Sequence, residues 1–174
     1  TIELDLAKEP TATPNGWKAQ GHDFAITDSG IVYQDGNVKV EAFQHKHWEL
    51  PYNYAYRITT PDRVLVIGGD GAADDRLISA AQGADVFVME VCTEAYLGNA
   101  PWGGESLEQK QEVIWQYHIK PRDLARIASA AKVKTLVLYH VQNYSDPYDP
   151  EAVLKEVREY YQGTVVQARD GDIF

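Results

Sequence analysis

With 174 residues, 44% of them hydrophobic and 24% charged, the sequence is expected to form one domain that buries a sizeable core. Its 26 acidic residues against 16 basic residues give a formal net charge of −10, which argues against the broad basic surface that binds a nucleic-acid backbone. The single cysteine, Cys92, excludes an internal disulfide, and the lack of any apolar run of about 18 residues excludes a transmembrane helix.

The first 37 residues are punctuated by glycine and proline, and only two short runs in them, 24–26 and 31–33, have strand character. They contain neither an initiator Met nor the apolar segment of a signal peptide, so we expect a chain that was processed or truncated at its start. The turn signal Asp35-Gly36-Asn37 predicts a hairpin between residues 31–33 and an alternating strand at 38–43. His22, in this region, is expected to be solvated.

Residues 54–58 alternate again and pair antiparallel with the preceding strand, and a turn at 60–63 leads into Val64–Ile67. These four consecutive apolar residues are typical of a strand buried on both faces. Two glycines, Gly68 and Gly69, then turn the chain sharply. A lone carboxylate, Asp70, follows them.

After residue 70 the pattern alternates between helices and strands. A short helix with Asp74 and Asp75 at its N-terminus is predicted to end at Gly83, and a strand at 86–89 follows it. Two more helices are predicted next, one from a capping box at Ser106–Gln109 to about Tyr117 and one from Pro121 to about Ala131, followed by a strand at 135–139. The last elements are a helix with Asp149 as N-cap and Pro150 as first residue, which ends at Gly163, and a strand at 164–166. This order predicts an α/β fold, a mixed β-sheet with flanking helices.

Polar side chains follow directly after several of these strands. Asp70, Glu90 and His140 come at the ends of three of them, and His45 and His47 lie just beyond a fourth. In open α/β sheets the crevice beyond the carboxyl ends of the strands is where ligands bind. Imidazole nitrogens and carboxylate oxygens are the ligands that zinc and related divalent ions prefer, so the pattern predicts a metal site.

Each candidate also has a purely structural interpretation. Asp70 can serve as a turn residue or helix N-cap, Glu90 can pair with Arg57 or Arg76, and His140 can be a core histidine bonded to a backbone carbonyl. His118 lies between two predicted helices and can cap the first of them. Because His45 and His47 alternate along an extended segment, only one of them can point into a shared site.

Together these residues carry a family resemblance. From about Asn37 to Phe174 the chain resembles the carboxyl-terminal half of a metallo-β-lactamase-fold hydrolase, closest to the ribonuclease Z-like and arylsulfatase-like branch. The segments that match are Val40–His47 with Tyr54–Ile58, Gly68–Gly71, Ala84–Glu90, Tyr117–Pro121 and Leu136–His140.

The resemblance implies half or more of an αββα sandwich, with residues 1–174 as a single domain and the carboxyl-terminal portion of a longer chain. It implies that His47, Asp70 and His140 are metal ligands, with Asp70 bridging two metals, and that Glu90 and His118 form a catalytic acid–imidazole pair. Two divalent ions are expected, zinc first and manganese or iron as alternatives. Their bridging hydroxide would attack an ester, phosphodiester or lactone.

Three features depart from the family pattern. Gly71 replaces the usual Thr or Ser after the bridging Asp, Lys120 replaces a capping Ser or Thr, and the His-x-His-x-Asp-His motif is absent from the sequence. We therefore expect partial or no metal occupancy in this chain and an inactive fragment of a hydrolase. The alternative is a metal-free relative that serves as a binding or assembly module.

The expected partners follow from charge and from the resemblance. They are a small-molecule ester-type substrate, no nucleic acid, no membrane, and self-association or pairing with the missing amino-terminal half. Aromatic residues in or beside the predicted loops either wall a substrate pocket or pack in the core: Tyr96, Trp102, Trp115, Tyr144 and Tyr148.

Overall fold

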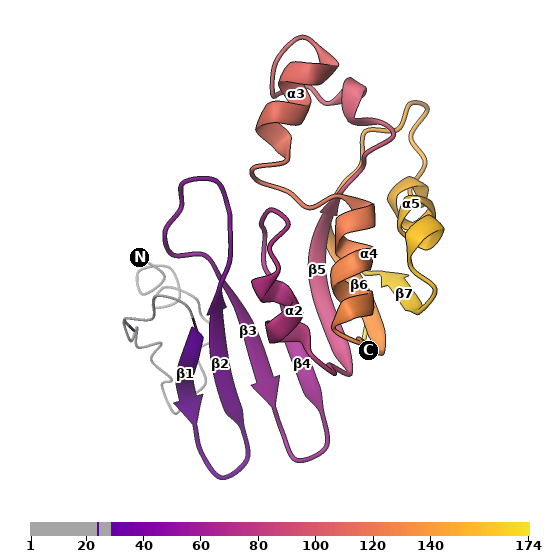
Figure 1. Ribbon diagram of the computed structural model, residues 1–174. Helices are drawn as coiled ribbons and strands as arrows, with labels where there is room; N and C mark the ends of the chain where they lie inside the picture. Colours follow the sequence, from indigo (N-terminus) through magenta and orange to yellow (C-terminus); the bar gives the residue numbers. More distant parts are fainter. Residues whose placement is uncertain (1–23, 25–28) are drawn as a thin grey trace, which may run out of the picture.

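The computed structural model describes Phe24 and residues 29–174, which form a seven-stranded sheet with helices (Figure 1). The strands lie in the sheet in chain order, β1 to β7. The elements are β1 Ser29–Gln34, β2 Lys39–Gln44, β3 Tyr54–Thr59, β4 Val64–Ile67, α2 Arg76–Ala81, β5 Val86–Cys92, the 3-10 helix η1 Leu97–Asn99, α3 Leu107–Ile114, α4 Pro121–Ala130, β6 Thr135–Gln142, α5 Ala152–Tyr160 and β7 Thr164–Gln167.

The sheet is mixed because its two halves are connected differently. β1 to β4 pair antiparallel, and β4 to β7 pair parallel. The hairpin predicted at Asp35-Gly36-Asn37 is confirmed: Asp35 Oδ1 accepts hydrogen bonds from the backbone N–H groups of Asn37 (2.7 Å) and Val38 (2.8 Å). Parallel neighbours need a crossover, and helices in the intervening segments provide it. The predicted α/β fold is therefore confirmed.

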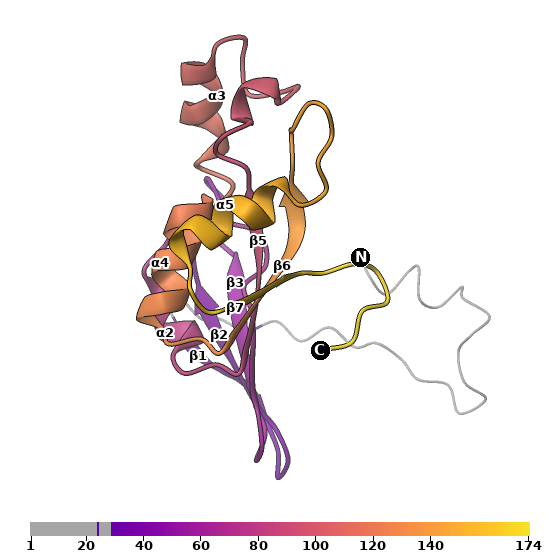
Figure 2. The same cartoon turned by 90° about the vertical axis from the view of Figure 1, so that its right-hand side faces the viewer.

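Helices α2, α4 and α5 lie on the same face of the sheet, as the view in Figure 2 shows. The core forms between them from every second strand residue: Val66 of β4 is fully buried, as are Phe87 and Met89 of β5. Residue Ile67 of β4, by contrast, is 38% exposed. The prediction that Val64–Ile67 is buried on both faces is wrong for the described residues, because a run of apolar residues does not reveal which faces helices cover.

The predicted starts of α3 and α4 are confirmed, and the start of α5 is shifted. Ser106 and Gln109 form the reciprocal capping box of α3, and Pro121 occupies the first turn of α4. Helix α3 ends at Ile114 rather than near Tyr117. Helix α5 begins at Ala152, later than predicted, although Asp149 Oδ1 still accepts from the Glu151 backbone N–H at 2.9 Å.

Two expectations fall outside the described residues, the strand that includes 25–26 and the environment of His22. Among the residues that are described, none of the helices has the length and apolar character needed to cross a membrane.

Candidate metal centre

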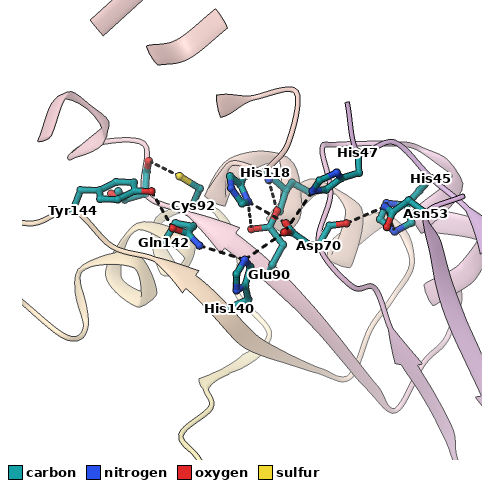
Figure 3. Close-up of polar contacts among 12 residues, drawn as sticks. His45, His47, Asn53, Asp70, Glu90, Cys92, His118, His140, Gln142 and Tyr144 are labelled. Atoms are coloured by element: carbon teal, nitrogen blue, oxygen red, sulfur yellow. Dashed lines mark hydrogen bonds and ion pairs between the residues drawn. The ribbon is translucent and has the colours of Figure 1, made fainter. Parts of the chain in front are cut away.

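Five polar side chains gather where the carboxyl ends of β4, β5 and β6 meet (Figure 3). Asp70 follows β4 across the turn made by Gly68 and Gly69. The φ of Gly69, 75°, lies in the left-handed region that glycine adopts without strain. The strands themselves carry the Glu90 and His140 side chains. The other two, His47 and His118, come from the segment after β2 and the segment between α3 and α4.

Asp70 is the centre of this group. Its Oδ2 atom lies 3.5 Å from His47 Nε2 and 3.3 Å from His140 Nε2, and its Oδ1 atom lies 3.0 Å from His118 Nδ1. Burial raises the Asp70 pKa, but the hydrogen bond and charge of His118, followed by the charges of His140 and His47, outweigh burial and lower it overall. The three imidazoles, far apart in the sequence, thus surround one carboxylate that is ionised at neutral pH.

Glu90 lies fully buried behind His118. Its Oε1 atom accepts from the Ile119 backbone N–H at 2.8 Å, and its Oε2 atom lies 3.2 Å from His118 Nδ1. The arginines proposed as structural partners bind elsewhere: Arg57 donates to backbone carbonyls of α2 and the residues after it, and Arg76 pairs with Asp74. The arginine-pair interpretation of Glu90 is therefore excluded.

The contacts of His118 determine its protonation. Burial by itself lowers its pKa, but hydrogen bonds to the Asp70 and Glu90 carboxylates, and their charges, raise it from 6.5 to about 9. Burial raises the pKa of Glu90 to about 7, although the hydrogen bond and charge of His118 oppose this. Without a metal, contact with the two acidic side chains therefore favours the imidazolium form of His118 at neutral pH.

His140 and His118 do not adopt the structural roles considered for them. His140 is partly exposed, has a positive φ of 44°, and contacts Asp70 and the Gln142 side-chain nitrogen (3.3 Å) rather than a backbone carbonyl. A positive φ in a residue other than glycine is strained, and such strain clusters at functional sites. Gln142 was not predicted as a site residue; its position two residues after His140 on the same strand was the available signal.

The two histidines after β2 point to different places, as their alternation predicted. The His45 ring is buried, with Nε2 2.7 Å from the Gly68 carbonyl oxygen and 3.2 Å from Asn53 Nδ2. This ring fills the space beside Gly71: a Cβ atom on Gly71 would lie 2.6 Å from His45 Cε1 and 2.6 Å from the Lys46 carbonyl oxygen. The missing hydroxyl at Gly71 therefore leaves no gap, because the imidazole of His45 occupies the place of a side chain.

The donor set fits a divalent cation. One ligand atom each from Asp70, His118 and His140 lie within 4.8 Å of one another. Among the described side chains, the buried nitrogen and oxygen atoms that lack a hydrogen-bond partner include His47 Nδ1, which belongs to this group. Imidazole and carboxylate ligands suit zinc and related ions. The predicted set contained His47 in place of His118, so the geometry leaves His118 with two candidate roles, metal ligand and proton donor.

The group opens into a cavity of about 550 Å³. Its walls include His47, Asp70, His118 and His140 together with Trp102, whose ring meets the His118 ring edge-on at 5.7 Å between centroids. Of the aromatic residues expected to wall a pocket or pack in the core, Trp102 therefore lines this cavity. Tyr144 packs against a small core cluster that contains Cys92, Leu97, Ala100 and Ile114.

Comparison with known proteins places these residues in context. No protein-family model matches the chain. Ribonuclease Z of Myxococcus xanthus is 34% identical over 111 residues, which cover 64% of this chain and 32% of that protein. Ribonuclease BN of Enterobacter sp. is 32% identical over 157 residues, which cover 84% of this chain and 48% of that protein. The chain thus spans between a third and a half of the length of these relatives.

Solved structures agree on the fold. The metallo-β-lactamase fold protein YhfI from Bacillus subtilis superposes with a TM-score of 0.60 at 22% identity, covering 82% of this chain and 51% of that one. The short form of human tRNase Z superposes with a TM-score of 0.58 at 18% identity, covering 85% and 47%.

The relatives correct one set of expectations. Both relatives named above are ribonucleases, which contradicts the predictions of a small-molecule ester substrate and of no nucleic acid. The error came from the net charge of −10. Net charge describes the sum over the chain, whereas a single phosphodiester is recognised by a few local groups and ions, so an acidic total does not exclude an RNA substrate.

Proposed function

We propose, from the premise that this chain is a metallo-β-lactamase-fold hydrolase of the ribonuclease Z-like type, that its site serves the metal-dependent hydrolysis of a phosphodiester bond in RNA. The observation that carries the proposal is the convergence of His47, His118 and His140 on the single carboxylate of Asp70, at 3.0 to 3.5 Å. The similarity to two ribonucleases supports RNA as the substrate class.

Asp70, His140 and His47 are the proposed metal ligands. Both histidines turn Nε2 toward Asp70 Oδ2, so the two imidazole nitrogens lie next to the same carboxylate oxygen. A bound divalent ion, zinc first among the candidates, supplies Lewis-acid stabilisation of the phosphoryl oxygens and lowers the pKa of a water molecule. Asp70, with two oxygens directed at different histidines, is the residue able to bridge two ions.

His118 is the proposed proton donor. Its Nδ1 atom lies near two carboxylates, at 3.0 and 3.2 Å, so this nitrogen carries a proton and is not itself available to a metal. With Nδ1–H directed at Asp70 and Glu90, the Nε2–H of the imidazolium is the proton available to a leaving alkoxide in the cavity. Glu90 keeps the ring oriented and raises its pKa.

The chain lacks the His-x-His-x-Asp-His motif, so the two histidines and one aspartate proposed as ligands are a partial set for two ions. We accordingly propose that the isolated chain binds metal weakly and hydrolyses RNA slowly or not at all, as part of a longer hydrolase. A metal-free binding module is less well supported, because the buried Glu90 and the cluster of imidazoles carry a desolvation cost that such a module has no need to bear.

Metal binding is the decisive test, because it does not depend on activity. Zinc and manganese are titrated into the metal-free chain by calorimetry, with the bound metal counted by elemental analysis. We expect binding to be lost in Asp70→Asn and retained in His118→Ala, while Asp85→Asn, a carboxylate paired with Lys134, serves as the control. Failure of the wild-type chain to bind either metal overturns the proposal. Loss of metal in His118→Ala reassigns His118 as a ligand.

Hydrolysis is measured on the same variants with a single-stranded RNA and with bis(p-nitrophenyl) phosphate. Any metal-dependent cleavage that disappears in Asp70→Asn supports phosphodiester hydrolysis. Metal-dependent cleavage of a lactone or carboxylic ester without cleavage of either phosphodiester contradicts it.

A further inference from the structure

A second cavity, of about 370 Å³, lies beside the candidate metal centre and takes its walls from the same three segments of the chain. Its lining residues are the sequence neighbours of the centre's residues: three of them flank or follow His47, two follow Asp70 and Gly71, and two precede Tyr117 and His118. They are Lys46, Trp48 and Glu49, then Ala72 and Ala73, then Trp115 and Gln116.

Trp48 is the distinctive wall of this second cavity. It is 51% exposed and its φ is 48°, a left-handed conformation that is strained for a bulky residue. The conformation is held by a 2.7 Å hydrogen bond from the Trp48 backbone N–H to the Gln116 carbonyl oxygen, and by stacking of the indole on Tyr117 at 5.5 Å and 26°. The chain therefore presents a large aromatic ring to solvent at a conformational cost.

The backbone around Trp48 is fixed before any ligand arrives. The Lys46 N–H donates to Asp74 Oδ2 at 3.1 Å, and the Lys46 carbonyl accepts from the Ala72 N–H at 2.9 Å. The Leu50 N–H donates to the His47 carbonyl oxygen at 3.0 Å, which closes the turn. A preorganised aromatic wall loses little entropy when a flat ligand stacks on it.

The groups around the ring match a nucleotide. The indole of Trp48 offers a stacking surface, and the Lys46 ammonium matches a phosphate. The Glu49 carboxylate and the Gln116 amide oxygen can hydrogen-bond the edge of a base, while Gln116 Nε2 donates to the Glu112 carbonyl oxygen. Stacking of bases on aromatic side chains is the usual way in which proteins hold unpaired nucleic acid. No large basic surface is needed for one nucleotide.

We propose that this second cavity binds one unpaired nucleobase of the RNA substrate, stacked on Trp48, beside the phosphodiester held at the candidate metal centre. The proposal rests on the proposed function for the identity of the substrate. Tyr117 lies between the second cavity and the candidate metal centre, because its ring stacks on Trp48 and also meets the His47 ring edge-on at 5.4 Å. A base held on Trp48 is thereby positioned relative to His47.

The test measures binding in EDTA, so that it does not depend on the metal centre. The fluorescence anisotropy of a labelled single-stranded oligoribonucleotide is compared with that of the same ribose-phosphate chain without bases. Trp48→Asn removes the stacking surface but keeps a residue that tolerates a positive φ, and Trp48→Phe retains an aromatic ring. Tyr148→Asn, which removes an exposed aromatic residue outside the second cavity, is the matched control.

We expect Trp48→Asn to weaken binding of the base-bearing RNA about tenfold, the size that stacking of one base implies, and to leave the abasic chain unaffected. Trp48→Phe should retain most of the affinity, and Tyr148→Asn all of it. Equal binding of the two chains by the wild type, an equal loss for both in Trp48→Asn, or no loss at all overturns the base site. Binding of neither chain overturns it as well. The proposed function fails on a different result, the absence of metal binding that depends on Asp70.

Discussion

Replacing Glu90 by Gln tests how the buried carboxylate controls His118. The substitution keeps the shape of the side chain, and its amide oxygen can still accept the Ile119 N–H bond that Glu90 Oε1 accepts at 2.8 Å. It removes the negative charge whose Oε2 atom lies 3.2 Å from His118 Nδ1. The perturbation is therefore electrostatic, and the neighbouring packing stays in place.

The expected change in the His118 pKa follows from the hydrogen bond to Glu90 that the substitution weakens. A hydrogen bond to a charged group is worth about 1.5–3 kcal/mol, which corresponds to about one to two pH units of titration. The pKa of His118, about 9 in the wild type, should therefore fall to about 7–8 in Glu90→Gln. The direction is downward because the removed carboxylate favoured the charged imidazolium, while burial of the ring continues to oppose it.

Nuclear magnetic resonance of the His118 ring in the metal-free protein measures this directly, as chemical shift against pH. Glu94→Gln is the control, since Glu94 is a carboxylate just after β5 that pairs with Arg122 instead. Circular dichroism confirms that each variant is folded. The reasoning is refuted if His118 titrates at the same pH in the wild type and in Glu90→Gln, or if Glu94→Gln lowers the His118 pKa equally.

Three further substitutions test the architecture of the site. Asp70→Asn should lower the affinity for zinc at least tenfold in calorimetry, because it removes the carboxylate that the three histidines share; a full-strength isotherm would contradict this. Gly71→Ser should destabilise the fold by about 1–3 kcal/mol in urea unfolding, because its Cβ would lie 2.6 Å from the Lys46 carbonyl oxygen. Gly36→Ser is the control: a Cβ atom at Gly36 meets open space, so the midpoint of urea unfolding should stay unchanged. Glu156→Ala should lower the free energy of unfolding by about 1–3 kcal/mol, because it leaves without acceptors the backbone N–H of Glu94, which donates to Glu156 Oε2 at 2.7 Å, and the Thr93 hydroxyl, which donates to Oε1; a loss below about 1 kcal/mol would contradict this.

Local chemistry made several elements readable in the sequence. The Asp35 turn, the capping box at Ser106 and the Pro121 start each depend on residues within a few positions of one another, so their signals lie in short windows of sequence. The α5 start shifted because Asp149 makes its hydrogen bond to Glu151 from a turn outside the helix. The substrate class was misjudged because net charge carries no information about local recognition.

By itself the sequence determined the order of strands and helices, the polar residues at the strand ends and the opposite directions of His45 and His47, because these depend on side-chain periodicity along one strand. Only the tertiary structure decided which sheet face the helices cover, that three distant imidazoles meet at Asp70, and that the His45 ring fills the space beside Gly71. The physical reason is that these contacts join residues more than twenty positions apart. Their distances depend on strand register and helix packing, which no short window of sequence specifies.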